Sequence, residues 1–264
     1  MKTANTGNDI KSTGRVHLLD EIRGFAIICM VVYHVGFLLK EFYAVRVPLM
    51  FDPWFYYVWA VFAGSFIFIS GVACRYSRDN VRRGAKCFFL GMAVSYVTAL
   101  AVPEVTILFG ILHFMGVCMM LFGLCEKVID KVPIKFGLPL CFLLMFATWN
   151  VIAGLFGFGG VNSLFTIVLP SALYESGLLF PLGFKGSGFS SGDYFPLMPW
   201  GFLYLGGAYA GAWLKAGNAP TWVYSCKLPV SVLRVAGRNT IWIYLAHQPV
   251  AMAVLYLLLG APRF

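Results

Sequence analysis

The chain has 264 residues, of which 60% are hydrophobic and 12% are charged, and its mean hydropathy is +0.80. This composition excludes a water-soluble domain of this length and indicates an integral membrane protein. The net charge of +9 does not indicate nucleic-acid binding, because the basic residues cluster at the ends of apolar segments. Seven cysteines lie mostly inside or at the ends of these segments, so we expect small core residues and no disulfide: Cys29, Cys74, Cys87, Cys118, Cys125, Cys141 and Cys226.

The first residues of the chain are polar and lack the basic-then-apolar pattern and the small-residue cleavage site of a signal peptide. We therefore expect residues 1–18 to form a cytoplasmic N-terminal segment. Residues 19–264 are expected to form a single transmembrane domain whose first span is retained.

The first predicted span, residues 19–39, begins in a charged cluster and carries a histidine deep inside it. The eleven residues from Arg23 to His34 correspond to roughly 16 Å along a helix, about halfway through a hydrocarbon core of roughly 30 Å. Eleven residues also return to nearly the same azimuth, so Arg23 and His34 should share one helix face. Ionisable groups at such depth are more often functional than structural, although a histidine bonded between packed helices is the alternative.

Four further spans are predicted before residue 157, at 54–74, 85–102, 105–124 and 136–156. Aromatic residues at the start of the first of these, such as Trp54 and Trp59, fit an interfacial belt. A dense basic turn is expected between Arg75 and Lys86, and a second charged loop covers residues 126–135.

Residues 157–196 break this pattern, because glycines, prolines and charges alternate with short apolar pieces. We expect an external loop there, with a re-entrant or surface-lying segment near residues 164–173. The last two spans are predicted at 197–214 and 240–259. With seven spans and a cytoplasmic N-terminus, sixteen of the twenty Lys and Arg residues are cytoplasmic, whereas an eighth span at 163–181 lowers this number to fourteen.

Three of the four histidines, His34, His113 and His247, fall inside predicted spans at similar depths near the midplane. They could form one site or be independent core residues. A metal site is disfavoured, because the sequence has no HxxxH or His/carboxylate spacing in these spans and no acids at that depth to support the ligands.

Arginines concentrate at the expected cytoplasmic ends of the spans. Some of them simply satisfy the positive-inside rule and bind anionic membrane lipids. The pair Arg75 and Arg78 is expected to continue a helix, which would place two guanidinium groups on one face for bidentate phosphate contacts. A cytosolic polyphosphate donor is therefore a candidate ligand.

Five motifs in order carry a family resemblance: LDEIRGFAIICMVVYH, FIFISG, GILHFMGV, DYFPLMPW and GRNTIWIYLAHQP. From Arg15 to about Leu259 the chain resembles bacterial membrane proteins related to the catalytic domain of heparan-alpha-glucosaminide N-acetyltransferase. The Arg23 to His34 spacing and the RxxR motif also resemble the membrane acyltransferase-3 proteins. The sequence departs from the lysosomal enzyme in being shorter, with no room for its luminal domain, so that enzyme's glycan substrate does not carry over.

The resemblance implies a multi-pass α-helical acyltransferase of the bacterial cytoplasmic membrane. Such an enzyme would move an acetyl group from cytosolic acetyl-CoA to an amine or hydroxyl of a sugar-like acceptor at the outer face. Arg23, Arg75 and Arg78 would hold the CoA phosphates and His34 would be the catalytic base. The wider set of candidate donor-binding residues adds Arg82, Arg238 and Asn239.

The chemistry of acyl transfer suggests further roles. His113, Asn239 or Gln248 could donate a hydrogen bond to the developing oxyanion, and His247 is a further catalytic candidate. Asp193, Tyr194 and Trp200 could orient a sugar at the outer mouth, with Gln248 also a substrate-binding candidate. The alternative for the DYFPLMPW segment is an interfacial aromatic anchor.

Two other functional classes fit parts of the sequence. A proton-coupled transporter of a small anionic or sugar solute would also use histidines at the midplane, but no inverted repeat and no intramembrane carboxylate supports it. A catalytically silent assembly partner is the other alternative. The acceptor's identity, the acyl chain length and the formation of a homodimer are left open.

Overall fold

The computed structural model describes residues 16–158, 163–226, 228 and 230–262. The predicted N-terminal segment at residues 1–18 therefore lies almost entirely outside the described residues. Most of the described chain is helical, and its residues group into two compact units. One unit comprises residues 1–69 and 216–264, and the other comprises residues 70–215.

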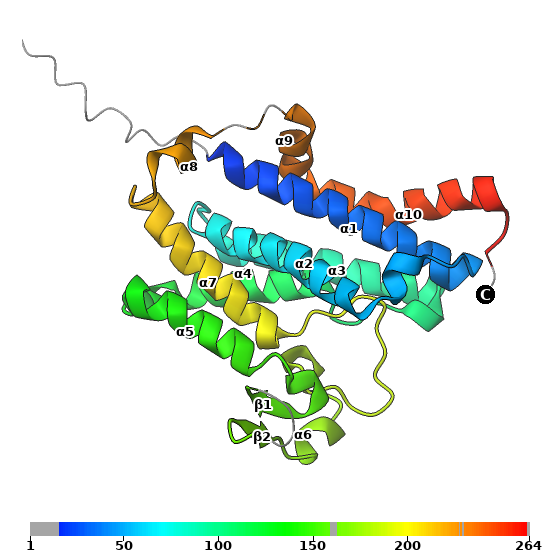
Figure 1. The fold of residues 1–264 in the computed structure, drawn as a ribbon, viewed down its shortest axis with the longest axis horizontal. Coiled ribbons are helices and arrows are strands. Elements are labelled where there is room, and N and C mark those ends of the chain that lie inside the picture. The colour runs from blue at the N-terminus through cyan, green and yellow to red at the C-terminus, as the bar shows by residue number, and fades with distance from the viewer. Residues whose placement is uncertain (1–15, 159–162, 227, 229, 263–264) are drawn as a thin grey trace, which may run out of the picture. The chain divides into compact units, whose positions relative to one another are not determined.

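The first unit is built on α1 (His17–Tyr43), which packs against α9 (Ser231–Arg238) and α10 (Thr240–Leu259), as Figure 1 shows. It also contains a 3-10 helix at Pro48–Phe51, the first part of α2 (Pro53–Cys74) and the short α8 (Thr221–Ser225). The buried residues of α1 recur at helical spacing, including Asp20, Gly24, Ile27, His34 and Leu38. His34 therefore belongs to the face by which α1 packs.

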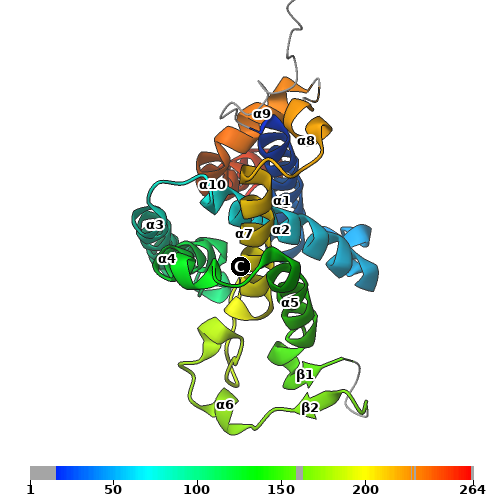
Figure 2. The same cartoon turned by 90° about the vertical axis from the view of Figure 1, so that its left-hand side faces the viewer.

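The second unit pairs α3 (Asn80–Ala101) with α4 (Ile111–Ile129), and α5 (Ile134–Ala147) with α7 (Leu197–Lys215), as seen in Figure 2. Small residues permit the close contact between α3 and α4. A Cβ on Gly84 would lie 2.6 Å from the carbonyl oxygen of Gly116, so a side chain there would force the helices apart.

Two helix starts differ from the predicted ones. Helix α3 begins at Asn80, where the Asp79 carboxylate accepts a 2.8 Å hydrogen bond from the backbone N–H of Arg82. Because of this cap, Arg82 and Lys86 lie on a helix and not in the predicted basic turn. Helix α4 begins only at Ile111, because residues 103–110 form a 3-10 helix (Pro103–Val105) and an irregular entry with Phe109 at φ 55°.

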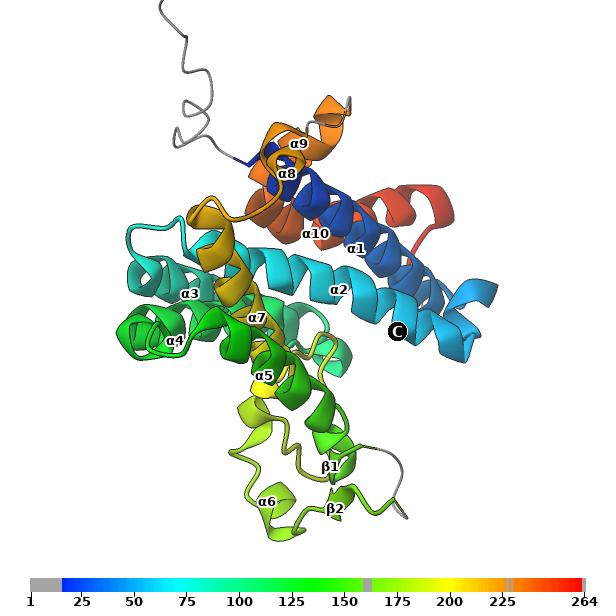
Figure 3. The same cartoon turned by 60° about the vertical axis from the view of Figure 1, so that its left-hand side comes forward.

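Residues 157–196 contain no helix long enough to span a membrane within their described part, as predicted. Strand β1 (Leu155–Gly157) pairs antiparallel with β2 (Thr166–Val168), and α6 (Ala172–Glu175) and a 3-10 helix (Phe180–Leu182) follow (Figure 3). The Tyr194 hydroxyl donates a hydrogen bond to the Phe180 carbonyl at 2.5 Å, and burial raises the pKa of this phenol. The end of the segment is also tied to the entry of α4, because the backbone N–H groups of Gly192 and Phe195 donate to the carbonyls of Thr106 and Phe109.

Six helices in the described chain are long and apolar enough to cross a membrane: residues 17–43, 54–74, 80–101, 111–129, 134–153 and 240–259. The all-α polytopic membrane architecture predicted from the sequence is confirmed. The sixth predicted span, 197–214, coincides with α7, which is not among these six. Its helix is interrupted at Met198 (φ −103°, ψ 123°), which leaves residues 199–215 as its regular part.

Candidate functional site

Two histidines and a glutamine meet inside the first unit. The side chains of His34 on α1 and His247 on α10 are 6% and 8% exposed, and their ring centroids lie 4.9 Å apart. The side-chain amide nitrogen of Gln248 lies 3.3 Å from Nδ1 of His34. The structure therefore brings together three of the predicted site residues, although His34 is more than two hundred positions from the other two in the sequence.

The hydrogen bonds of this pair indicate which ring nitrogen carries a proton. Nδ1 of His247 lies 2.5 Å from the backbone carbonyl oxygen of Tyr244, which can only accept a hydrogen bond. A neutral His247 therefore carries its proton on Nδ1 and has the lone pair on Nε2. With the Gln248 amide nitrogen assigned toward His34, this amide donates a hydrogen bond to Nδ1 of His34, and the proton of the neutral His34 ring is on Nε2. One imidazole is set to accept a proton and the other to donate a hydrogen bond.

The local sequence of α10 explains why the pair sits where it does. His247 and Gln248 are consecutive, so their side chains diverge by about 100° and both reach the same α1 residue from different sides. Pro249 follows them inside the helix and has no N–H to donate to the preceding turn.

The third predicted histidine, His113, lies in the other unit. It is the third residue of α4, only about 3 Å along the axis from the helix start, whereas the sequence predicts a helix that begins at residue 105 and places His113 about 12 Å along it. The irregular entry at residues 103–110 shortens the helix and causes this difference. The His113 ring is buried against Phe88 and stacked on Phe109 at centroid distances of 5.4 and 6.0 Å.

Asp193, predicted to orient a sugar, is buried at the start of α4. Its Oδ2 accepts a hydrogen bond of 3.0 Å from the backbone N–H of Ile111. The residue before the helix, Gly110, has no side chain to cap it, so Asp193 supplies the missing acceptor from a distant part of the chain. Trp200, from the same predicted motif, is 4% exposed and packs against Trp149 and Phe195.

The side chain of Arg75 contacts several residues of its own unit. Its guanidinium forms ion pairs with Asp130 at 2.7 Å and with Glu126 at 3.5 Å. It also donates a hydrogen bond to the Ala208 carbonyl and lies over the Phe122 ring. Helix α2 ends at Cys74, so Arg75 and Arg78 do not continue a helix, and the predicted helical i,i+3 pair does not form. The sequence placed both acids in a charged loop but gave no signal that they pair with Arg75.

Arginines of the first unit surround two buried acids near the start of α1. Arg234 of α9 contacts Glu21 through Nε at 3.2 Å and Nη2 at 2.7 Å, and Leu228 N–H donates to the other oxygen of the carboxylate. Arg23 and Arg238 approach the Asp20 carboxylate at 3.9 and 3.7 Å, and their side chains are 19% and 44% exposed. The remaining candidates, Arg78, Arg82 and Asn239, are exposed.

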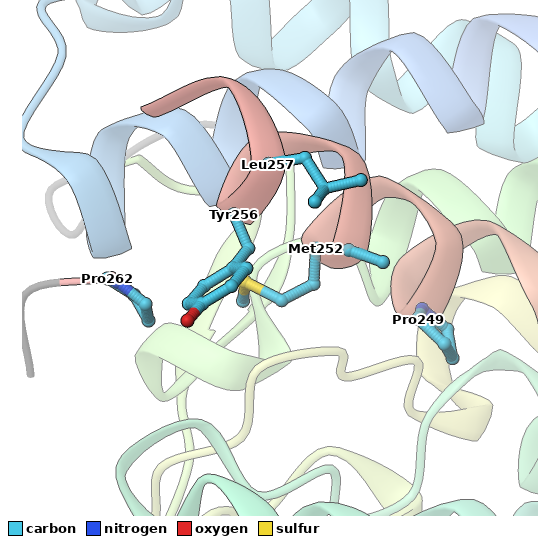
Figure 4. Close-up of a pocket in the computed structure, with 6 residues that line it drawn as sticks. Pro249, Met252, Tyr256, Leu257 and Pro262 are labelled. Carbon is cyan, nitrogen blue, oxygen red and sulfur yellow. The ribbon is translucent and has the colours of Figure 1, made fainter. Parts of the chain in front are cut away.

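A cavity of about 530 Å³ lies along the second half of α10 and is shown in Figure 4. The six residues that line it, among them Met252, Tyr256 and Leu257, include no carboxylate, amine or imidazole, so this cavity offers no acid–base chemistry.

Among the described residues, no group of three or more His, Cys, Asp or Glu side chains could hold a metal ion, and the seven cysteines are free thiols.

Fold and site together define a polytopic α-helical membrane protein with a buried imidazole pair held by two of its apolar helices. The chain belongs to the heparan-alpha-glucosaminide N-acetyltransferase catalytic family, whose model matches residues 15–249. Membership of this family implies an acetyltransferase embedded in a membrane, and it confirms the resemblance carried by the five motifs. Comparisons with curated proteins and with solved structures return no significant match.

Proposed function

We propose that this protein transfers an acetyl group from acetyl-CoA to an amine or hydroxyl of a sugar-like acceptor, across the bacterial cytoplasmic membrane. Family membership supports acetyl transfer. The observation that carries the mechanism is the buried pair of His34 and His247, whose ring centroids lie 4.9 Å apart. Buried imidazoles facing one another between apolar helices fit proton transfer better than structural packing.

The reaction forms one bond and breaks another. The acceptor nitrogen or oxygen attacks the acetyl carbonyl carbon, its proton passes to a base, and CoA leaves as a thiolate that is then protonated. The sequence favours His34 as this base. The hydrogen bonds of the two histidines instead support His247 in that role: Nε2 of His247 would accept the proton, and Nε2–H of His34 would donate to the developing oxyanion.

The donor would be held by cations at the start of α1. All three arginines of that region are partly exposed, but Arg234 lies 2.7 Å from the fully buried Glu21, whereas Arg23 and Arg238 lie 3.9 and 3.7 Å from Asp20 and are the better candidates. Arg23 lies about 16 Å along α1 from His34, so phosphates bound there would leave the thioester arm to run along the helix toward the imidazoles. Arg78 and Arg82 remain candidates for phosphate contacts, but the ion pairs of Arg75 make it a poor one.

Acetyl transfer is tested with the purified protein in lipid nanodiscs, by following release of CoA thiol from acetyl-CoA in the presence of amino sugars and hydroxylated sugars. We expect His34→Ala and His247→Ala each to lower the rate at least about a hundredfold, in the range typical of a lost general base. The matched control is Val32→Ala, because Val32 lies on the same helix two residues from His34 and is 67% exposed. Parent-like rates in both variants would overturn the mechanism, and no CoA release from the parent with any acceptor would overturn the function.

A further inference from the structure

A cavity of about 430 Å³ in the first unit lies where α1 ends and α2 begins, and its volume is within the range of small-molecule sites. From α1 it is lined by Tyr33, Phe37 and Lys40, which follow one another at helical spacing and therefore share one face of the helix. From α2 it is lined by Phe55 and Trp59, which are four residues apart. One face of each helix therefore contributes to the same cavity.

The aromatic side chains of this cavity form a wall of neighbouring rings. The ring of Tyr33 lies nearly parallel to that of Phe55, with centroids 6.1 Å apart and an interplanar angle of 18°. Trp59 lies 6.1 Å from Tyr33 and 5.8 Å from Tyr56, at angles of 40° and 31°. The face of an aromatic ring carries the negative part of its quadrupole and attracts ammonium groups, most strongly in tryptophan. The wall therefore favours a ligand with a cationic group.

One acidic and one basic side chain line the same cavity. Asp52 lies in the exposed linker between the helices and offers a carboxylate to an ammonium group. Lys40 contacts Glu41 at 2.8 Å, but the two side chains are 40% and 39% exposed, so this ion pair is weak. An ammonium group has three N–H donors, so Lys40 can bind a phosphate as well. A ligand with a single charge would be repelled by either Asp52 or Lys40, whereas a zwitterion pairs with both.

The position of the cavity at the ends of two helices indicates the source of such a ligand. Both α1 and α2 are long and apolar enough to cross a membrane. At the start of α2, Trp54 and Tyr57 are 50% and 65% exposed, as expected for aromatic residues at the membrane–water interface. Tyr56 lines the cavity and is itself 50% exposed, so the cavity is open to the surroundings of the helices. Phosphate groups are abundant at this depth, because they belong to the head groups of the lipids.

From this arrangement we infer that the cavity binds the head group of a zwitterionic phospholipid. The ammonium of the lipid would lie between the aromatic wall and Asp52, and its phosphate would be bound by Lys40. This inference goes beyond acetyl transfer and does not depend on it. The site also differs from the arginines that satisfy the positive-inside rule, because the negative charge of Asp52 disfavours a lipid that has a phosphate and no ammonium.

The test compares two phospholipids with the same hydrocarbon chains and phosphate, of which only one carries an ammonium. Native mass spectrometry of the full-length protein in detergent measures the dissociation constants of dihexanoyl-phosphatidylethanolamine and dihexanoyl-phosphatidylglycerol. We expect the parent to bind the ethanolamine lipid at least about tenfold more tightly, which corresponds to about 1.4 kcal/mol. Asp52→Asn keeps the shape of the side chain and removes its charge, so it should bring the two constants to within about threefold of each other.

Two further variants separate the ring faces from the phosphate contact. Trp59→Ala should weaken binding of the ethanolamine lipid at least about tenfold, because it removes the strongest cation-binding ring. Lys40→Gln should weaken binding of both lipids alike, because both carry the phosphate. The control is Tyr57→Ala, a neighbouring aromatic residue outside the cavity lining, which should bind both lipids as the parent does. Soluble phosphoethanolamine is the second probe, and it should bind more weakly than the lipid.

Three results would overturn the assignment. The first is equal affinity of the parent for the two lipids, and the second is an unchanged preference for the ethanolamine lipid in Asp52→Asn. The third is binding of soluble phosphoethanolamine as tightly as the lipid, which would make the ligand a soluble molecule. If Trp59→Ala fails to fold, Asp52→Asn still decides the question, because Asp52 is exposed and its substitution leaves the packing of the helices unchanged.

Discussion

Glu21 shows how a single buried charge decides the role of its neighbours. The carboxylate is fully buried, and Arg234 and the Leu228 N–H supply its hydrogen bonds. A buried ion pair is costly to form, but removing one partner leaves the other charge buried and uncompensated. Arg234 therefore holds α9 against α1 and is poorly placed to bind a donor phosphate as well.

Arg234→Ala should lower the free energy of unfolding by about 3 kcal/mol, because Glu21 would lose its compensating charge. Thermal unfolding of the purified protein in detergent is the measurement. Arg238→Ala is the matched control on the same helix: its side chain is 44% exposed and lies 3.7 Å from Asp20, so its removal should cost less than about 1 kcal/mol. Equal losses in the two variants would contradict this account.

The side-chain amide of Gln248 contacts the proposed catalytic residue His34. Gln248→Leu removes the amide that faces Nδ1 of His34 and leaves the imidazole pair itself in place. We expect kcat for acetyl transfer to fall about tenfold, or about 1.4 kcal/mol in the barrier, with little change in KM for acetyl-CoA. Steady-state kinetics with varied donor concentration separates the two parameters. A higher KM with unchanged kcat would mean that Gln248 binds the donor and does not position His34.

The contact between α1 and α9 depends on glycines on both helices. A Cβ on Gly24 would collide with the Leu233 carbonyl oxygen and lie 2.9 Å from the Gly237 nitrogen. A Cβ on Gly237 would in turn collide with the Asp20 carbonyl oxygen. Backbone atoms cannot move aside as a flexible side chain can, so α9 approaches α1 closely enough for the Arg234–Glu21 pair only because both positions are glycine.

Gly24→Ala should therefore destabilise the protein by about 2 kcal/mol or more, a typical cost of overpacking, and it should weaken the Arg234–Glu21 pair at the same time. The control is Gly201→Ala in α7, where the nearest atom to an added Cβ is 3.8 Å away. Thermal unfolding compares the two variants. A double-mutant cycle of Gly24→Ala with Arg234→Ala should be non-additive, and full additivity would show that the contact and the ion pair are independent.

The number of membrane crossings is a property of the whole chain, and α7 decides it. If α7 crosses the membrane, the following linker lies on the same side as the N-terminus, which agrees with the cytoplasmic bias of Lys and Arg in the sequence. If α7 does not cross, this linker and its basic residues lie outside. Residues 199–215, the regular part of α7, are about 25 Å long, which is near the lower limit for a span.

We expect a cysteine placed at Asn218, in a variant without the native cysteines, to react with a membrane-impermeant maleimide only from the cytoplasmic side. Asp52→Cys in the same background should react only from the opposite side, and it serves as the control for orientation. Labelling in intact cells and in inverted vesicles gives the two readings. Reaction of both positions from the same side would show that α7 does not cross the membrane.

The spacing of apolar residues was enough to predict a polytopic helical protein and most of its spans, because a segment that crosses a bilayer must be apolar over a fixed length. It also placed Arg23 and His34 on one unbroken helix, since distance along a helix follows from residue number. Helix starts at Asn80 and Ile111 were missed, because they depend on the Asp79 cap and on an acceptor, Asp193, that lies far away in the sequence.

The spacing of residues in the sequence could not predict which partners the polar side chains have. A helical pattern identifies the face on which a residue lies, but the residue that meets it comes from another segment and is fixed by packing. Thus His34 meets His247 and Gln248, and Arg75 meets Asp130. Spacing within each segment follows from the local geometry of the chain, whereas the meeting of distant side chains arises only when their helices pack together.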